Sequence, residues 1–366
     1  MRIRELDGLR ALAIIAVLVH HYLLWAPGLV WVAGNAWLGV DLFFILSGFL
    51  ITSILVDLRS SAAYFRTFYL RRALRIFPAY MIMLAIYFAT SLVVQKLGSA
   101  GLWLRYIFYY SSLIPIHIPF TAQSAGVWSP VLMGLGVLWS LSVEEVYYTI
   151  WAPIVRWIPL RLFPLLLVFL IVLSPAMRSY FNQFDNSLHL FVCRADSMAY
   201  GSLIAFLVQW MRAQGKQLKE PWLNGGMLLW GMGTLFFWIK FHVGASPRVF
   251  YSLGVSMANI FLAMLVLRVI CNAGKNALPE RVLRWKVLQS IGKISYTLYL
   301  VNYFFRGLMQ ELCRVQCFSA HLSMAVVTVG GISLSFGASY LMWHGVEKRV
   351  LRLKDVFAPT EVRVVA

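Results

Sequence analysis

Apolar stretches of nearly 20 residues recur along the whole chain. About 20 such residues suffice for a helix to cross the roughly 30 Å hydrocarbon core of a bilayer. Candidate spans fall at residues 9–26, 36–56, 76–95, 134–155, 162–177, 194–211, 225–241, 249–270, 290–310 and 320–344. Because backbone polar groups in lipid must be bonded within the spanning structure, runs of this length predict helices. The sequence therefore predicts an all-α fold, a polytopic integral membrane helical bundle of about ten transmembrane helices.

The distribution of charge indicates a membrane protein and not a nucleic-acid-binding one. Only 13% of the residues are charged, whereas soluble domains contain about 25%, yet the net charge is +18. When the amino terminus is placed inside, most of the 32 lysines and arginines fall on the inner side. This bias follows the positive-inside rule and predicts that both termini are cytoplasmic. No nucleic-acid partner is expected, because the topology accounts for the positive charge.

Two segments allow more than one interpretation. Residues 102–118 are aromatic and apolar enough to span, but a further crossing would reverse the sides of all later loops. We expect them at the outer interface or packed as a re-entrant piece, since tyrosine and tryptophan suit the headgroup boundary. A cleaved signal peptide is the alternative for the first stretch. Asp7 and Arg10 interrupt its start and its apolar run is long, which favours a membrane span.

No repeat, low-complexity tract or linker divides the chain. We therefore predict a single transmembrane domain over residues 1–354, followed by a short cytoplasmic tail at residues 355–366. Any chemistry then depends on side chains in or near the bilayer.

Arg10 and His21 share one face of the first predicted helix. They are eleven residues apart, which is three turns plus roughly 20°, or about 16 Å along the axis, while His20 points elsewhere. Asp7 lies three residues before Arg10 and can pair with it. Ionisable groups in a membrane are costly, so a functional role is the first hypothesis. The alternative is an arginine that reaches the interface and a histidine that bonds a neighbouring helix.

Asp41 lies in the first third of the second predicted span and needs a partner there. The candidates are Arg10, His20 and His21. A contact with His21 would fix the tautomer of the ring and raise its basicity, which is the orienting role that a general base requires. The alternative is that Asp41 only neutralises an arginine. Gly48, in the middle of the same span, is expected to permit close packing of helices.

Three arginines in the stretch FYLRRALRIFPAY lie where the chain re-enters the membrane from the inner side. Arg72 and Arg75 are one turn apart, and Arg71 and Arg75 are four residues apart. Like charges at this spacing repel, and an anionic ligand would offset the repulsion. Arginine forks suit phosphates. The alternative is an anchor that contacts only lipid headgroups.

Two adjacent glutamates lie in the apolar stretch WSLSVEEVYYTIWAP. Glu144 and Glu145 are about 100° apart on a helix, so at most one of them faces a given cavity. Tyr148 is one turn beyond Glu144 and can bond it. Two carboxylates within a span require cationic partners or a polar ligand. Purely structural pairing is the alternative.

Taken together, the motifs resemble the membrane-bound acyltransferase-3 family. The resemblance rests on LDGLR with R-x10-H (Arg10, His21), GVDLFFILSGFLIT, FYLRRALRIFP, WSLSVEE, R-x-D with a following glycine (Arg194, Asp196, Gly201), GKISYTLYL and the late Glu347. Each motif is weak alone, but their order and their spread over nearly the whole chain make the joint resemblance specific. The chain has Asn302 where the family often has a histidine, and Lys348 where it often has a proline.

The resemblance implies transfer of an acyl group, usually acetyl, from cytoplasmic acyl-CoA to a hydroxyl of a sugar or another membrane-associated acceptor. It implies acyl-CoA as donor substrate, with no permanently bound cofactor and no metal. The other expected partners are a carbohydrate or glycolipid acceptor and the lipid bilayer, in a bacterial inner membrane. Carried over by position, the family's R-x10-H falls on Arg10 and His21, and its R-x-x-R pair on Arg72 and Arg75.

We therefore expect a membrane-embedded O-acyltransferase that acetylates a sugar of a surface polysaccharide, glycolipid or lipid-linked glycan. In this hypothesis His21, oriented by Asp41, removes the proton of the acceptor hydroxyl, and Arg10 stabilises the coenzyme or the developing oxyanion. The remaining expected site residues are Arg71, Arg72 and Arg75 for acyl-CoA, and Glu144, Ser47 and Tyr148 for the acceptor side or for structure.

A covalent acyl-histidine intermediate is an open alternative within this mechanism. A proton-coupled transporter of an anionic or glycan solute is the alternative class, because carriers also bury ionisable residues. Carriers often show inverted repeats, and none is found in this chain.

Overall fold

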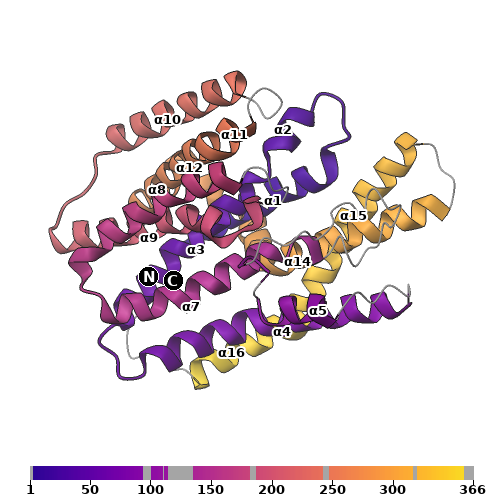
Figure 1. The fold of residues 1–366 in the computed structure, drawn as a ribbon, viewed down its shortest axis with the longest axis horizontal. Helices are drawn as coiled ribbons and strands as arrows, with labels where there is room; N and C mark the ends of the chain where they lie inside the picture. The colour runs from indigo at the N-terminus through magenta and orange to yellow at the C-terminus, as the bar shows by residue number, and fades with distance from the viewer. Residues whose placement is uncertain are drawn as a thin grey trace.

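The computed structural model describes residues 3–93, 100–109, 111–113, 135–181, 187–241, 247–315 and 320–357. Within these ranges the regular structure is helical, and no strand occurs (Figure 1). The longer helices are α1 (Arg4–Leu23), α3 (Leu38–Leu58), α4 (Tyr64–Val93), α7 (Trp139–Trp157), α8 (Phe163–Phe181), α9 (Phe191–Ala213), α10 (Glu220–Lys240), α12 (Val255–Cys271), α14 (Lys286–Val315) and α15 (Ala320–Met342). The shorter elements are α2 (Val30–Asn35), α5 (Ala100–Ile107), η2 (Leu160–Leu162), η3 (Ser187–His189), α11 (Pro247–Val249), η4 (Phe250–Gly254), α13 (Leu278–Leu283), η5 (Trp343–Glu347) and α16 (Lys348–Phe357).

Seven helical segments in the described residues are long and apolar enough to cross a membrane. They are Arg4–Leu23, Val30–Leu58, Tyr64–Val93, Leu160–Phe181, Phe191–Ala213, Phe250–Cys271 and Leu322–Leu353. The predicted all-α, polytopic membrane architecture is thus confirmed. The three other predicted spans coincide with α7, α10 and α14, and the count of ten and the cytoplasmic termini stay predictions.

The segment at residues 102–118 overlaps α5, a helix of eight residues that begins at Ala100. This length is too short to cross about 30 Å of hydrocarbon. Tyr80 of α4 donates a hydrogen bond to the backbone oxygen of Tyr106 at 2.7 Å, so α5 is fastened beside α4 (Figure 1). Residues 114–118 lie outside the described residues.

The central contact of the bundle is between α3 and α9, which pack along each other. Their backbones approach so closely that a Cβ on Gly48 would lie 2.1 Å from the Met198 carbonyl oxygen, and a Cβ on Gly201 would lie 2.0 Å from that of Ile45. Glycines at such a crossing let the two backbones meet, which is the usual device of membrane helix pairs. The expectation that Gly48 permits close packing is confirmed.

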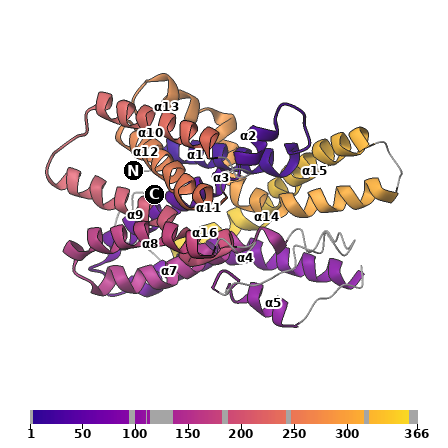
Figure 2. The same ribbon diagram turned by 45° about the horizontal axis from the view of Figure 1, so that its top comes forward.

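Helix α1 packs between α3 and α14, and α14 runs side by side with α15 (Figures 1 and 2). At the other end of the chain, Glu347 of η5 is buried and accepts a hydrogen bond from Thr297 of α14. Helix α16 extends to Phe357, beyond the predicted domain end at residue 354. Residues 358–366 lie outside the described residues, so the domain division stays a prediction.

Replacing Gly48 with alanine should destabilise the bundle, because the added methyl group overlaps the α9 backbone and the helices must move apart. Overpacking of this kind costs about 1–3 kcal/mol. Gly337→Ala in α15 is the matched control, since a Cβ there meets nothing within 4 Å. Thermal unfolding of the purified protein in detergent should show a lower midpoint for Gly48→Ala only; equal midpoints would contradict the close α3–α9 contact.

Candidate functional site

A cavity of about 70 Å³ lies between α1, α3, α4, α7 and α14. We call it the arginine cavity because three guanidinium-bearing residues line it: Arg10 of α1 and Arg72 and Arg75 of α4. All three side chains are half-buried. Among the described lining residues, Glu144 of α7 is the only acidic one. The other lining residues are Val40, Phe43, Phe44, Ser47, Ile76, Ser140, Leu141, Tyr148, Ser295, Tyr296 and Tyr299.

The carboxylate of Glu144 is held by two hydroxyl groups. Ser47 Oγ donates to its Oε1 at 2.9 Å, and the Tyr148 hydroxyl donates to its Oε2 at 2.9 Å. The guanidinium carbon of Arg72 lies 5.2 Å from the centre of the Tyr148 ring. The predicted contact between Tyr148 and Glu144 is therefore confirmed. Glu145, which points about 100° away around the helix, does not line this cavity.

A second cavity, of about 350 Å³, lies toward the other end of α1. We call it the histidine cavity because His20 and His21 of α1 and His189 of η3 line it. Its volume lies within the range of small-molecule sites. The other lining residues are Val17, Gly34, Asn35, Trp37, Val40, Gly136, Val137, Trp139, Leu188, Arg194, Phe250, Tyr251, Tyr299 and Tyr303.

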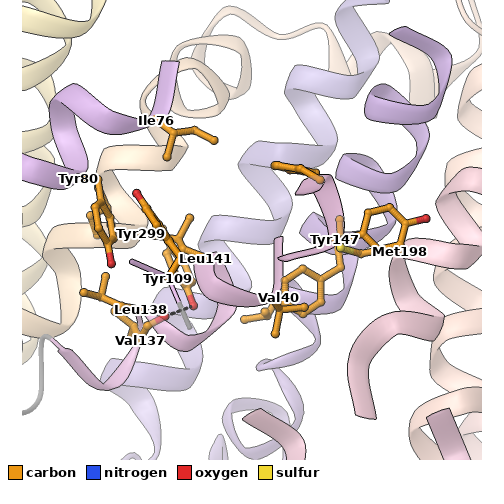
Figure 3. Close-up of a cluster of buried hydrophobic side chains, with 14 of the residues drawn as sticks. Val40, Ile76, Tyr80, Tyr109, Val137, Leu138, Leu141, Tyr147, Met198 and Tyr299 are labelled. Atoms are coloured by element: carbon orange, nitrogen blue, oxygen red, sulfur yellow. Dashed lines mark hydrogen bonds between the residues drawn. The ribbon is translucent and has the colours of Figure 1, made fainter. Parts of the chain in front are cut away.

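Val40 and Tyr299 line both cavities, so they form a shared wall. The Tyr299 hydroxyl lies 2.6 Å from Ser140 Oγ. It donates to the Val137 carbonyl oxygen at 3.0 Å, and Figure 3 shows both of these residues. These bonds fix the aromatic ring in the wall. Arg10 and His21, which were predicted to share one face of one helix, thus line two different cavities, and the wall of Val40 and Tyr299 separates these cavities.

His21 lies beside the aromatic and polar face of α14. Its Nδ1 is 2.5 Å from Asn302 Oδ1, and its ring centre is 4.4 Å from that of Tyr303. The expectation that His20 points elsewhere is wrong, because His20 lines the same cavity with its ring centre 5.5 Å from that of His21. His20 Nδ1 donates to the Ala33 carbonyl oxygen at 2.8 Å.

Asp41 does not contact His21, so the predicted orienting role is wrong. Asp41 is fully buried, and its Oδ1 accepts hydrogen bonds from Arg194 Nη1 at 2.7 Å and from Ser197 Oγ at 2.8 Å. An ionised carboxylate in a water-poor interior is stabilised far better by a guanidinium than by a neutral imidazole. The alternative, that Asp41 neutralises an arginine, holds, with Arg194 of α9 as its partner.

Arg194 is fixed by several elements at the edge of the histidine cavity. Its Nε donates to the Leu188 carbonyl oxygen at 3.0 Å, and its guanidinium lies 5.0 Å from the Trp37 ring and 5.5 Å from the Trp139 ring. His189 stacks on Trp139 at 4.6 Å. Burial and the positive charge of Arg194 lower the pKa of His189 to about 4, so this ring is neutral near pH 7.

The structure gathers most of the predicted site residues and separates a few. The arginine cavity contains Arg10, Ser47, Arg72, Arg75, Glu144 and Tyr148. His21 lines the histidine cavity, Asp41 lies behind Arg194, and Arg71 is not among the residues that line either cavity. In the described part of the chain, no group of three or more histidine, cysteine, aspartate or glutamate side chains is placed to hold a metal ion.

Sequence reasoning missed Tyr299, Asn302, His189 and Arg194 as site residues. Tyr299 and Asn302 share helical spacing with Ser295 and Tyr296 in the sequence, but such spacing is also typical of packing. The R-x-D motif contains Arg194, and no sequence signal indicated that it would meet Asp41.

Comparison with known proteins identifies the family of the chain. The family model described as an acyltransferase domain matches residues 3–344. The chain belongs to the membrane-bound acyltransferase-3 family, as its motifs predicted. It is thus an integral membrane protein of an acyltransferase class, and family membership gives no support to the transporter alternative.

Several curated relatives are O-acetyltransferases. The O-acetyltransferase OatA of Staphylococcus aureus (strain NCTC 8325 / PS 47) is 28% identical over 324 residues, which cover 81% of this chain and 49% of the relative. The peptidoglycan O-acetyltransferase OatA of Listeria monocytogenes is 36% identical over 157 residues, 40% of this chain and 23% of the relative. The putative peptidoglycan O-acetyltransferase YrhL of Bacillus subtilis is 37% identical over 156 residues, 40% of this chain and 22% of the relative. The chain spans about half the length of the Staphylococcus aureus relative and less of the Listeria monocytogenes relative. No solved structure matches the chain significantly.

Replacing Asp41 with alanine should leave Arg194 buried without its counter-charge, at a cost of about 3–5 kcal/mol. Arg194→Ala should destabilise similarly. The double variant removes both charges, so its loss of stability should be smaller than the sum of the two single losses. Thermal unfolding in detergent measures all three, with Asp57→Ala, at the other end of α3, as control. Additive losses would contradict the ion pair.

Proposed function

We propose that the protein is an O-acyltransferase that moves an acetyl group from cytoplasmic acetyl-CoA to a sugar hydroxyl of a cell-surface glycan. The observation that carries the proposal is the pair of cavities that share the wall of Val40 and Tyr299, with three arginines in one and His21 in the other. A donor and an acceptor that enter from opposite sides would meet at this wall.

The arginine cavity suits an acyl-CoA donor. Guanidinium forks bind phosphate oxygens in pairs, and Arg72 and Arg75 lie one turn apart on α4. A cavity of about 70 Å³ accommodates the acyl-thioester end and not a nucleotide. In our proposal the diphosphate of the donor binds Arg72 and Arg75, and its nucleoside stays outside the cavity, where Arg71 contributes to binding. The thioester points toward Val40 and Tyr299.

The histidine cavity suits a carbohydrate acceptor. Its volume of about 350 Å³ and its aromatic lining, which includes Trp37, Trp139 and Tyr303, resemble sites that bind small polar ligands through apolar faces and a few polar groups. The names of two relatives refer to peptidoglycan. We therefore propose a peptidoglycan sugar, or a lipid-linked precursor of it, as acceptor.

The proposed chemical step is direct acyl transfer. His21 accepts the proton of the acceptor hydroxyl while the hydroxyl oxygen forms a bond to the thioester carbonyl carbon. Arg10, about 16 Å along α1 from His21, binds the CoA donor in the arginine cavity. The carbon–sulfur bond then breaks, and the CoA thiolate takes the proton from His21. The products are the O-acetylated sugar and CoA.

The predicted membrane topology also tells which side of the membrane each cavity faces in our proposal. In the topology that the positive-inside rule predicts, the Arg10 end of α1 is cytoplasmic and the His21 end is outer. We propose that the cell supplies acetyl-CoA from the cytoplasm, that the acetyl group passes the wall, and that the bacterial inner membrane is the location.

Membranes that contain the protein should transfer radiolabel from acetyl-CoA to a peptidoglycan acceptor. No transfer, together with retained solute uptake, would contradict the proposal.

His21→Ala should lower kcat for acetyl transfer by roughly 10²–10⁴-fold, because the general base is lost. The exposed His344 of η5, which lies outside both cavities, provides the matched control His344→Ala. Both variants should insert into the membrane at wild-type levels, measured by immunoblot beside the transfer assay. Full activity of His21→Ala would remove the proposed base.

Replacing Arg72 and Arg75 with alanine should raise KM for acetyl-CoA at least about tenfold, because each charged hydrogen bond contributes roughly 1.5–3 kcal/mol. Arg66→Ala is the control, since Arg66 is exposed on the same helix and carries the same charge. Steady-state kinetics with varied acetyl-CoA measures the effect. An unchanged KM in the double variant would show that these arginines only anchor the chain.

A further inference from the structure

Asn302 of α14 is the side-chain partner of His21. It is fully buried, and its Oδ1 lies 2.5 Å from His21 Nδ1. The two residues are 281 positions apart, so only the packing of α1 against α14 brings them together.

Two further hydrogen bonds determine which way the Asn302 amide faces. Its Nδ2 donates to the carbonyl oxygens of Leu298 at 3.0 Å and Tyr299 at 2.8 Å. A carbonyl oxygen can only accept, so both positions require the NH₂ end of the amide and use both of its hydrogens. The opposite orientation would press the amide oxygen against two carbonyl oxygens. The Asn302 oxygen therefore faces His21.

This orientation determines the proton on the histidine ring. An amide oxygen has no hydrogen to give, so His21 Nδ1 must be the donor and must carry a proton. In a neutral imidazole the other nitrogen then has the free lone pair. His21 thus presents Nε2, and not Nδ1, as its basic atom.

We propose that Asn302 is a positioning residue that holds His21 in the Nδ1–H tautomer and so makes Nε2 the proton acceptor in acyl transfer. The proposal rests on the proposed function of His21 and goes beyond it, since it assigns the nitrogen and the residue that selects it. After Nε2 takes the acceptor's proton, the Nδ1–H bond to Asn302 persists and strengthens, because the donor is then charged. Asn302 supplies this bond without a buried charge of its own.

The backbone contacts of both helices hold this pair in place. The Tyr22 hydroxyl donates to the Asn302 carbonyl oxygen at 2.6 Å, so consecutive residues of α1 bind one residue of α14. Toward the Arg10 end, a Cβ on Gly292 would lie 2.0 Å from the Asp7 carbonyl oxygen, which shows how closely α1 and α14 approach. Tyr303 closes one face of the His21 ring at 4.4 Å. Among the described residues, Asn302 is thus the hydrogen-bond partner of the ring and Tyr303 packs beside it.

The first test is kinetic. Asn302→Leu removes the acceptor oxygen at similar size and should lower kcat by roughly 10- to 100-fold, part of the contribution of a positioned base. KM for acetyl-CoA should stay within about twofold, since Asn302 does not line the arginine cavity. Asn276→Leu, in an exposed loop, is the control. Wild-type kcat in a folded Asn302→Leu protein would overturn the proposal.

The second test is spectroscopic and does not depend on activity. Nitrogen-15 NMR of histidine-labelled protein reports which ring nitrogen carries the proton, and comparison with His21→Gln assigns the His21 signal. Wild type should show Nδ1–H at neutral pH, and Asn302→Leu should show a mixture or the other tautomer. An Nε2–H signal in wild type would overturn the proposal even if Asn302→Leu fails to fold. A fully active His21→Ala variant would instead remove the proposed function, and the tautomer measurement would still decide the role of Asn302.

Discussion

Arg194 and Asp41 form an ion pair at the centre of the bundle, and the geometry of the site depends on it. Both side chains are nearly or fully buried, where an unpaired charge costs several kcal/mol. The pair joins α3 to α9, and the same guanidinium binds the η3 backbone through Leu188 and faces Trp139 of α7. A second buried pair joins α8 to α9: both Nη atoms of Arg178 donate to the carboxylate of Asp196, which lies two residues beyond Arg194. The relative positions of α3, α7 and α9 are thereby restricted to one register.

This register creates the two cavities. With α3 fixed, Val40 lies opposite Tyr299 of α14 in the wall that both cavities share. Helix α1 passes along this wall, with Arg10 on one side of it and His21 on the other. The two residues are about three turns apart along the helix. In the proposed reaction, one helix thus contributes an arginine to the donor cavity and a histidine to the acceptor cavity.

Contacts within one helix were predictable from the sequence, and contacts between helices were not. The spacing of Arg72 and Arg75, and the bond between Glu144 and Tyr148, follow from the 3.6-residue turn alone. The partner of Asp41 was sought among cations in nearby sequence, whereas the actual partner, Arg194, is 153 positions away. Such a pairing depends on which faces of α3 and α9 meet, and that depends on Gly48 and its neighbours.

The partner of His21 was likewise not predictable from the sequence, because it lies on another helix. Asn302 occupies a position where the family often has a histidine, so the sequence marked it as a departure and gave no role. Its bond to His21 exists because α1 and α14 pack closely. The family resemblance, in contrast, predicted the class of protein correctly, because it used motifs spread over the whole chain.

The most direct measurement is the structure of the protein in lipid nanodiscs with a non-hydrolysable acetyl-CoA analogue, determined by cryo-electron microscopy. The account predicts that phosphate density lies beside Arg72 and Arg75 and that the acyl end reaches Val40 and Tyr299, across the wall from His21. An analogue whose phosphates lie on the His21 side, or whose acyl end lies away from this wall, would contradict it.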